Sequence, residues 1–213
     1  MKLTVFGATG GIGGQVVRQA LDAGHKVTAV ARDPARLAVR DHPSLEVVAV
    51  AGLTDPEPLL PALDGSDAAI SGVGPRSPRD VRVASSTGRA ILAALDQSGV
   101  RRFVAVSAMP VGPIAAGESW ANRRLRIPLL RTLLRGIYAD VAVLEDEIGR
   151  SRTDWTVVRP PLLVNRPLTG RYRTVVGGNV PRGRSISRAA VAHLMLAVLD
   201  DPATVRQAVG IAR

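Results

Sequence analysis

The chain has 213 residues, 46% of them apolar and 22% charged, which is enough for one globular domain with its own core. It contains no cysteine, so disulfide scaffolds, thiolate metal sites and cysteine nucleophiles are excluded. Its formal net charge is +10, and every basic residue except Lys2 and Lys26 is arginine.

Most of the excess positive charge follows residue 110, where 16 basic residues stand against 8 acidic ones. Single-stranded nucleic acids need aromatic stacking platforms, but no part of this sequence alternates rings with arginines. Zinc-finger and RNP1 patterns are absent as well. We therefore expect no nucleic-acid partner; an anionic small ligand and a bias toward arginine codons remain as explanations of the charge.

Strand-like and helix-like segments alternate along the chain. Strands are expected at Leu3–Phe6, Lys26–Val30, Leu45–Val50, Ala68–Ser71, Arg102–Val106 and Trp155–Val158. Helices are expected at Ile12–Ala23, Pro56–Leu63, Val81–Ser98 and Pro128–Arg150. This alternation predicts an α/β fold with a doubly wound parallel sheet.

The tail has a different pattern. It predicts a strand over Arg171–Val176, a helix over Arg188–Leu199 capped by Ser187, and a last strand over Val205–Ile211. We expect a single domain over residues 1–213, in which residues 160–190 form most of a small C-terminal substrate lobe.

A glycine-rich loop joins the first strand to the first helix, with the spacing Gly7-x-x-Gly10-x-x-Gly13. Gly7 allows a tight turn, Gly10 allows the backbone to approach a pyrophosphate, and Gly13 allows the helix to pack closely on the sheet. The helix N-terminus offers free N–H groups to phosphate. The strand–loop–helix context predicts a dinucleotide site.

The second strand leads into Arg32 and Arg36. A site selective for NAD places a carboxylate at this position, whereas guanidinium groups suit the 2′-phosphate of NADP. The interpretation is NADP(H) as the preferred cofactor and NAD(H) as the alternative, because Asp33 could face the ribose instead.

With these motifs the chain resembles the atypical short-chain dehydrogenase/reductases, in the NAD(P)H-binding (NmrA-like) branch, and most of all the flavin reductase/biliverdin reductase B type. The resemblance spans nearly the whole chain. The segments that carry it are Phe6–Gly10 with Gly13, Ala31–Leu37, Val106–Ala108, Asp154–Pro161, Arg166–Tyr172 and Ile186–Arg188.

The resemblance implies a Rossmann fold, a nicotinamide cofactor and a substrate cleft over the carboxyl ends of the strands. It matches Ser107 to the family serine near the nicotinamide, which is the one catalytic residue we expect; a strand-end cap is the structural alternative. The cofactor-binding residues expected in this way are Gly7, Thr9, Gly10, Gly11, Ile12, Gly13, Arg32, Arg36, Gly74, Ser107 and Pro160.

One departure bears on the reaction. Many superfamily members supply a proton from a Tyr-x-x-x-Lys motif, but here Tyr138 is followed four residues later by Ala142. Reducing a ketone needs such an acid, whereas a delocalised acceptor can take its proton from solvent. We therefore expect an NADPH-dependent oxidoreductase that passes hydride to a flavin-, tetrapyrrole- or quinone-like acceptor.

Two other functions remain open: an NmrA-like redox sensor that binds NADP(H) without turnover, and an epimerase- or dehydratase-like enzyme. No metal site is expected, because His25, His42 and His193 form no cluster, and His193 is interpreted as a core or interface residue. The third strand leads to Gly52 and Leu53, so any adenine contact there would be backbone or apolar.

Arginine and leucine are concentrated in residues 123–135. As a helix, this region places Leu130, Leu133, Leu134, Ile137, Val141 and Leu144 on one stripe. We interpret it as a crossover helix packed on the sheet. The alternatives are a basic amphipathic helix lying on an anionic membrane and a mobile flap formed by the preceding loop, Pro110–Ile127.

The first apolar run meets Gly7 too early for a signal peptide, and no apolar segment approaches the ~20 residues of a spanning helix. The expectation is a cytoplasmic protein, monomeric or homodimeric, whose partner is a small-molecule acceptor and not a membrane.

Overall fold

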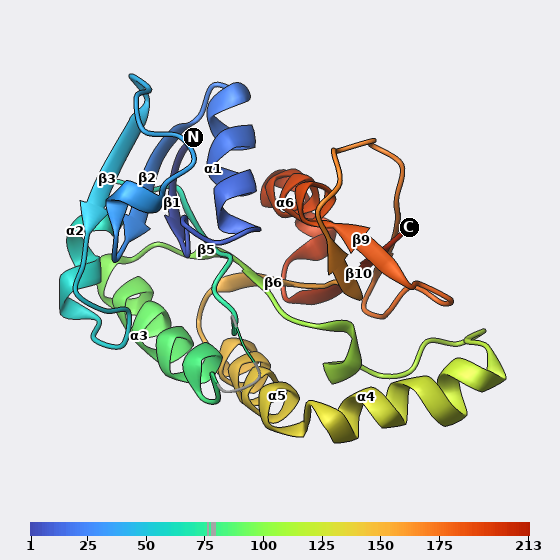
Figure 1. Ribbon diagram of the computed structural model, residues 1–213. Coiled ribbons are helices and arrows are strands. Elements are labelled where there is room, and N and C mark those ends of the chain that lie inside the picture. Colours follow the sequence, from blue (N-terminus) through green and yellow to red (C-terminus); the bar gives the residue numbers. More distant parts are fainter. Residues whose placement is uncertain (76, 78–79) are drawn as a thin grey trace.

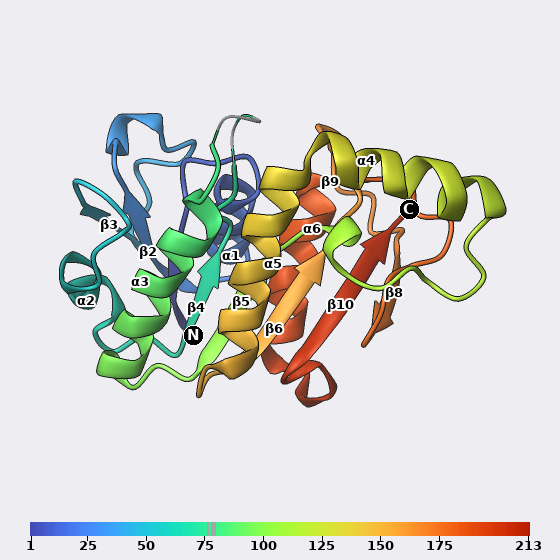
Figure 2. The same cartoon turned by 90° about the horizontal axis from the view of Figure 1, so that it is seen from below.

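A computed structural model of the chain describes residues 1–75, 77 and 80–213, apart from the side chain of Arg126. An eight-stranded sheet with the order β3-β2-β1-β4-β5-β6-β10-β8 forms its centre (Figures 1 and 2). The strands are β1 (Lys2–Phe6), β2 (Lys26–Ala31), β3 (Leu45–Ala49), β4 (Ala68–Ser71), β5 (Arg102–Val106), β6 (Asp154–Arg159), β8 (Arg173–Val176) and β10 (Gln207–Ala212). Only β8 runs antiparallel to its neighbour in this sheet, so the predicted doubly wound parallel fold is confirmed.

Helices cover both faces of the sheet (Figure 1). On one face lie α1 (Gly13–Asp22) and α6 (Arg188–Ala197), and on the other lie α2 (Leu60–Leu63), α3 (Val83–Ser98) and α5 (Arg135–Arg150). Each face has its own buried cluster: Val16, Val17 and Met195 belong to the first, and Phe103 and Ile148 to the second. Two packed layers thus hold the strand ends in fixed positions.

The prediction of one continuous helix over Pro128–Arg150 is wrong in one respect. It is divided into α4 (Ile127–Leu133) and α5, because Leu134 between them leaves the helical region with φ −113° and ψ 27°. A π-helical turn, Asn122–Arg126, precedes α4. The predicted buried stripe holds on α5, where Val141 and Leu144 are buried, but Leu133 is 69% exposed.

The C-terminal region contains two strands that the sequence did not predict. β7 (Leu162–Val164) and β9 (Ser185–Ser187) form a small parallel pair beside the main sheet. The predicted cap of α6 is confirmed, since the Ser187 hydroxyl accepts the Ala190 N–H at 3.1 Å. His193 is exposed rather than in the core, and the Tyr172 hydroxyl lies 2.6 Å from its Nδ1.

A carboxylate on α5 caps the start of α3. Buried Asp140 accepts the backbone N–H of Ala84 at 2.8 Å and of Ser85 at 3.2 Å, and also the Ser85 hydroxyl. A negative charge at a helix N-terminus satisfies free N–H groups and opposes the helix dipole. Asp140 thereby ties the two helices of this face together.

An arginine at the start of β5 joins three parts of the chain. The Arg102 guanidinium donates to the carbonyl oxygens of Asp154 (2.5 Å), Leu199 (3.0 Å) and Val198, and to the Thr156 hydroxyl (2.9 Å). Burial lowers the pKa of Arg102, although nearby acidic residues oppose this effect. Arg102 therefore links β5, β6 and the end of α6.

Candidate functional site

A cleft of about 830 Å³ opens over the carboxyl ends of β1, β2, β4 and β5. The strand order reverses between β1 and β4, which is the place where open α/β sheets bind ligands. Its lining comprises Gly7, Thr9–Ile12, Val30–Arg32, Gly52–Thr54, Gly72–Pro75, Asp80, Val83, Ala84, Ser86, Thr87, Val106–Ala108, Ile137, Val141, Leu163 and Arg188.

The glycine loop forms the floor of the cleft, where backbone segments pack closely against each other. Gly7 has φ +73°, and the Gly10 N–H donates to the Gly7 carbonyl at 2.8 Å. A Cβ at Gly13 would lie 2.2 Å from that same carbonyl oxygen, and a Cβ at Gly72 would lie 2.8 Å from the Gly13 nitrogen. The backbone of β4 and the start of α1 therefore approach each other at glycines, which leaves the N-terminus of α1 open toward the cleft. This arrangement fits a pyrophosphate.

The two arginines predicted beside the second strand are separated by the structure. Arg32 lines the cleft directly after β2, whereas Arg36 is exposed at the end of a short 3₁₀ turn and lies outside the lining. Asp33 caps this turn, because its carboxylate accepts the Ala35 N–H at 3.1 Å. Only Arg32 thus lies where the sequence predicts a cofactor contact.

Ser107 stands at the end of β5 inside the cleft, and its hydroxyl donates to the carboxylate of Glu145 on α5. Arg159, at the end of β6, forms an ion pair with the same carboxylate; its Nε lies 2.9 Å from Oε1. The side chains of Glu145 and Arg159 are only 12% and 13% exposed. Ser107 is therefore one end of a partly buried polar chain, and the direction of its hydroxyl proton is fixed by its partner.

Tyr138 lies on α5 one residue after Ile137, which lines the cleft, and is not itself part of the lining. Burial raises the pKa of Tyr138, which is the opposite of the effect that an activating lysine would have. Both observations indicate that Tyr138 is a packing residue.

Arg188 closes the cleft from the side of α6. Its side chain lies over the glycine loop, since a Cβ at Gly11 would come within 2.6 Å of the Arg188 Cδ. The guanidinium is held by the side-chain oxygen of Asn165 at 2.7 Å. The rim of the cleft therefore carries a second cation, positioned by the C-terminal segment.

The structure brings most of the predicted site residues together. The cleft is lined by Gly7, Thr9, Gly10, Gly11, Ile12, Arg32, Gly74 and Ser107. Gly13 is buried beneath the loop, and Arg36 is exposed outside the lining. Pro160 is outside the lining as well, and its carbonyl accepts the Met109 N–H at 2.8 Å. The start of the supposed flap is anchored by Arg131, which donates to the Pro110 and Gly112 carbonyls at 2.8 and 2.9 Å.

Sequence reasoning missed Gly72, Glu145, Leu163 and Arg188. The glycines that follow β4 carried a usable signal, since they end a strand that neighbours the glycine loop. Glu145 lies 38 residues from Ser107 and Arg188 lies 23 residues from Asn165, so no local pattern joins either pair.

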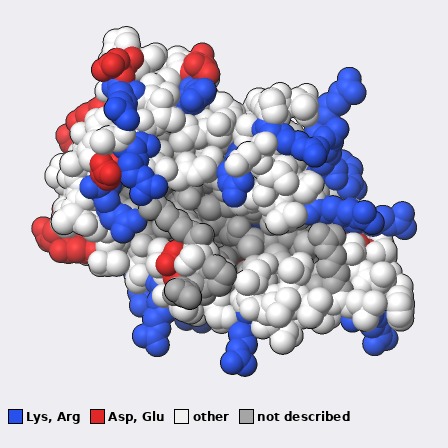
Figure 3. Space-filling view, in the orientation of Figure 1, with Lys and Arg blue, Asp and Glu red and all other residues white. Residues whose placement is uncertain are grey.

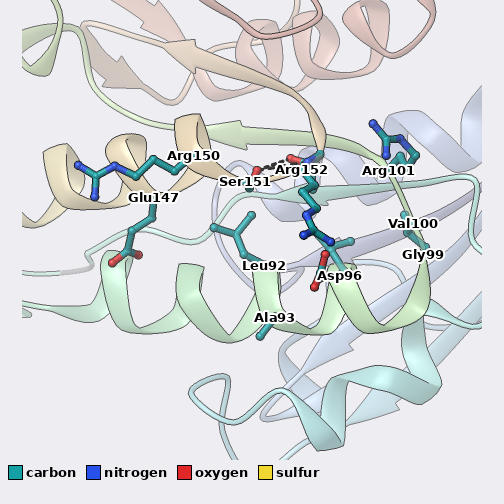
Figure 4. A pocket seen from close by; sticks show the side chains of 12 residues that line it. Leu92, Ala93, Asp96, Gly99, Val100, Arg101, Glu147, Arg150, Ser151 and Arg152 are labelled. Carbon is teal, nitrogen blue, oxygen red and sulfur yellow. Dashed lines mark hydrogen bonds between the residues drawn. The ribbon is translucent and has the colours of Figure 1, made fainter.

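A second hollow, of about 710 Å³, lies between the C-terminal ends of α3 and α5 (Figure 4). Leu92 and Val100 contribute apolar surface, and Arg152 and Asp96 point toward each other. It lies at the opposite end of the sheet from the glycine loop, so it is separate from the candidate cofactor cleft.

The sequence profile of a family described as NAD(P)H-binding matches residues 7–202, from the glycine loop to the end of α6 and beyond. This chain belongs to the NAD(P)H-binding family. The resemblance to NAD(P)H-binding proteins is thereby confirmed. An uncharacterized chloroplastic protein of Arabidopsis thaliana is 32% identical over 207 residues, which cover 93% of this chain and 71% of that protein.

Solved structures share the fold. A short-chain dehydrogenase/reductase from Veillonella parvula in complex with NADP is 20% identical, with a TM-score of 0.81 over 100% of this chain and 94% of that one. An anaerobillin reductase from Escherichia coli O157:H7 is 19% identical, with a TM-score of 0.78 over 100% and 97% of the two chains. At these identities the likeness establishes the Rossmann fold. In the part of the chain that the structure describes, no helix is long and apolar enough to cross a membrane.

Proposed function

We propose that this protein is an NADPH-dependent reductase that delivers hydride to a delocalised acceptor such as a flavin, a linear tetrapyrrole or a quinone. The observation that carries the proposal is the state of Ser107. Its hydroxyl lies in a glycine-floored cleft, but its proton is already donated to Glu145. A hydroxyl held in this way orients ligands and does not serve as the acid of a carbonyl reductase.

Different residues of the chain would bind different parts of the cofactor. The backbone of Gly7–Gly10 and the N-terminus of α1 would hold the pyrophosphate, with Arg188 above it. Arg32 would hold a 2′-phosphate, and the commitment of Asp33 to the Ala35 N–H supports NADP(H) over NAD(H). When bound there, a reduced nicotinamide supplies the hydride.

Ser107 and Glu145 would set the orientation of the nicotinamide ring. Because the Ser107 proton points to Glu145, the hydroxyl oxygen presents lone pairs to the cleft and accepts an amide N–H. Arg159 compensates the charge of the partly buried Glu145 carboxylate. The remaining proton that reduction requires comes from solvent, since no tyrosine lies among the described residues that line the cleft.

The test combines cofactor binding with turnover. NADPH and NADH binding would be followed by fluorescence, and oxidation of NADPH would be followed with FMN, riboflavin, biliverdin and menadione. We expect micromolar NADPH binding and oxidation with at least one of these acceptors. Ser107→Ala and Glu145→Gln should lower kcat while changing the Kd of NADPH little, because both affect ring orientation more than phosphate binding.

Two results would reject the proposal in different ways. Failure to bind NADPH below about millimolar would remove the cofactor assignment itself. Tight binding of NADP⁺ without oxidation by any acceptor would instead favour the redox sensor, whose cleft would need the same phosphate contacts. The proposed location is the cytoplasm, where NADPH is available.

A further inference from the structure

The outer side of α4 is apolar and has no protein partner among the residues that the structure describes. Leu125, Leu129 and Leu133 follow one another at intervals of four residues and are 61%, 59% and 69% exposed. Trp120, just before the π-helical turn, is 71% exposed. We call these four residues the α4 face. Exposed apolar side chains in a continuous row mark an interaction surface more often than scattered ones do.

The opposite side of α4 is fixed to the protein. Ile127 is buried, and Arg131 donates to the carbonyls of Pro110 and Gly112. In Figures 1 and 2, α4 runs along the rim of the molecule, with its outer side turned away from the sheet. The helix therefore presents the α4 face as a firmly held ridge.

The charges beside this ridge indicate what it binds. No acidic residue stands between Glu118 and Asp140, whereas Arg123, Arg124 and Arg135 are exposed arginines of this segment. The flanking carboxylates are both engaged, since Glu118 accepts the Arg182 N–H at 3.0 Å and Asp140 caps α3. Figure 3 shows basic side chains projecting beyond the lower edge of the molecule, where α4 lies.

A second copy of the chain is a poor occupant for this face. Two α4 ridges packed against each other would bring two rows of arginines together with no carboxylate to pair them. An anionic lipid surface satisfies both features, because leucine and tryptophan enter the headgroup boundary while arginine stems extend to the phosphates. The charge excess of the C-terminal half adds attraction over a longer range.

We propose that the α4 face binds the surface of anionic membranes, with the helix lying in the plane of the headgroups. This goes beyond the proposed reductase activity and does not depend on it. The sequence predicted no membrane partner because this helix was interpreted as packed on the sheet, with Leu133 in its buried stripe; the exposure of Leu133 contradicts that position.

Flotation with vesicles tests the proposal. The native protein should float with vesicles of equal parts phosphatidylcholine and phosphatidylglycerol, and high salt should release it from them. With vesicles of pure phosphatidylcholine it should remain unbound at the bottom of the gradient. Leu125→Asn, Leu129→Asn and Leu133→Asn combined should weaken binding at least about tenfold. Arg123→Gln with Arg124→Gln should weaken it roughly fivefold for each charge removed.

Two controls keep the result specific. Val47→Asn replaces an exposed apolar residue on β3, at the other edge of the sheet, and should float as the native protein does. Trp120→Phe should retain flotation but lose the blue shift of tryptophan fluorescence that vesicles induce, because Trp155 is half-buried in β6. The melting temperature of every variant should match that of the native protein, since all these side chains are exposed.

Four outcomes would overturn the proposal. The native protein could stay behind with anionic vesicles, or the triple asparagine variant could float as well as the native protein. A native dimer that the triple variant splits, without any vesicle binding, would assign the α4 face to a second copy. Equal flotation with neutral and anionic vesicles would refute the role of the arginines.

Discussion

Arg32 and Arg36 look equivalent in the sequence, but only Arg32 lines the cleft. If Arg32 holds the 2′-phosphate, Arg32→Gln should weaken NADP⁺ binding roughly tenfold to a hundredfold, because a charged hydrogen bond is lost. NAD⁺ binding should change little, since that cofactor lacks the phosphate. Titration calorimetry of both nucleotides measures the two effects separately.

Arg36→Gln is the matched control for Arg32→Gln. It removes the same charge four residues away, so any general electrostatic attraction should fall equally in both variants. Equal losses of NADP⁺ affinity would contradict a specific contact from Arg32.

At the scale of residues, the sequence predicted those features of the site that depend only on residues close together along the chain. The glycine loop could be predicted because Gly7, Gly10 and Gly13 act within one turn of backbone. The partner of Ser107 could not, because Glu145 comes from another helix and meets Ser107 only when α5 packs on the sheet. A hydroxyl at a strand end does not specify which carboxylate it will bind.

At the scale of elements, the contact between α3 and α5 depends on Asp140. Asp140→Ala leaves two backbone N–H groups and the Ser85 hydroxyl without their partner, in a buried place. We expect a loss of about 2–3 kcal/mol in the free energy of unfolding. Urea denaturation followed by circular dichroism measures it.

Asp146→Ala is the control on the same helix. Asp146 forms an exposed ion pair with Arg150, four residues later, so its removal should cost less than about 0.5 kcal/mol. Similar losses in the two variants would show that Asp140 contributes through α5 itself and not through the cap.

Glu118 joins the segment before α4 to the C-terminal region, and its ionisation makes the stability of the folded protein depend on pH. Burial raises the pKa of this carboxyl, but hydrogen bonds from Asn122, Arg182 and Ser119 outweigh burial, and the net pKa is lowered. A lowered pKa in the folded state means that the stabilisation is complete above the ordinary glutamate pKa of about 4.3 and is lost as the pH falls below it.

Glu118→Gln tests this dependence. The native protein should melt at a higher temperature than the variant at pH 6, and the difference should shrink between about pH 4.3 and pH 3. Scanning calorimetry at several pH values gives the curve. A difference that stays constant down to pH 3 would mean that the ionisation of Glu118 contributes nothing.

The boundaries of α4 and α5 show why the sequence did not predict the break between these two helices. The apolar stripe predicted from Leu130 to Leu144 continues without a break, so the sequence predicts a single helix. Leu134 interrupts it because α5 packs on the sheet while α4 turns to hold the loop around Pro110 through Arg131. That choice depends on the tertiary position of the loop, which periodicity does not describe.

At the scale of the whole molecule, Arg102 connects β5 to β6 and to the turn after α6. Arg102→Met keeps the apolar stem but leaves the carbonyls of Asp154, Val198 and Leu199 without a donor. We expect a loss of about 3 kcal/mol, measured by chemical denaturation. Arg101→Met, which removes only an exposed pair with Asp154, should cost less than about 1 kcal/mol; a comparable loss there would argue against this role of Arg102.

The sheet as a whole could be predicted from the alternation of segments, but its far edge could not. β8 is antiparallel, and β10 inserts between it and β6, although β7, β8, β9 and α6 all lie between β6 and β10 in the sequence. Short strands near turns carry no signal of their partner or direction.

The place of β10 in the sheet has a consequence for the order of folding. Pairing β10 with β6 requires the chain between Arg159 and Gln207 to close into a loop first, and such non-local pairing is slow. Leu163 and Arg188, which line one side of the cleft, belong to that loop. During refolding, the helical signal should therefore recover before nucleotide binding does, since the glycine floor is local and its opposite wall forms last.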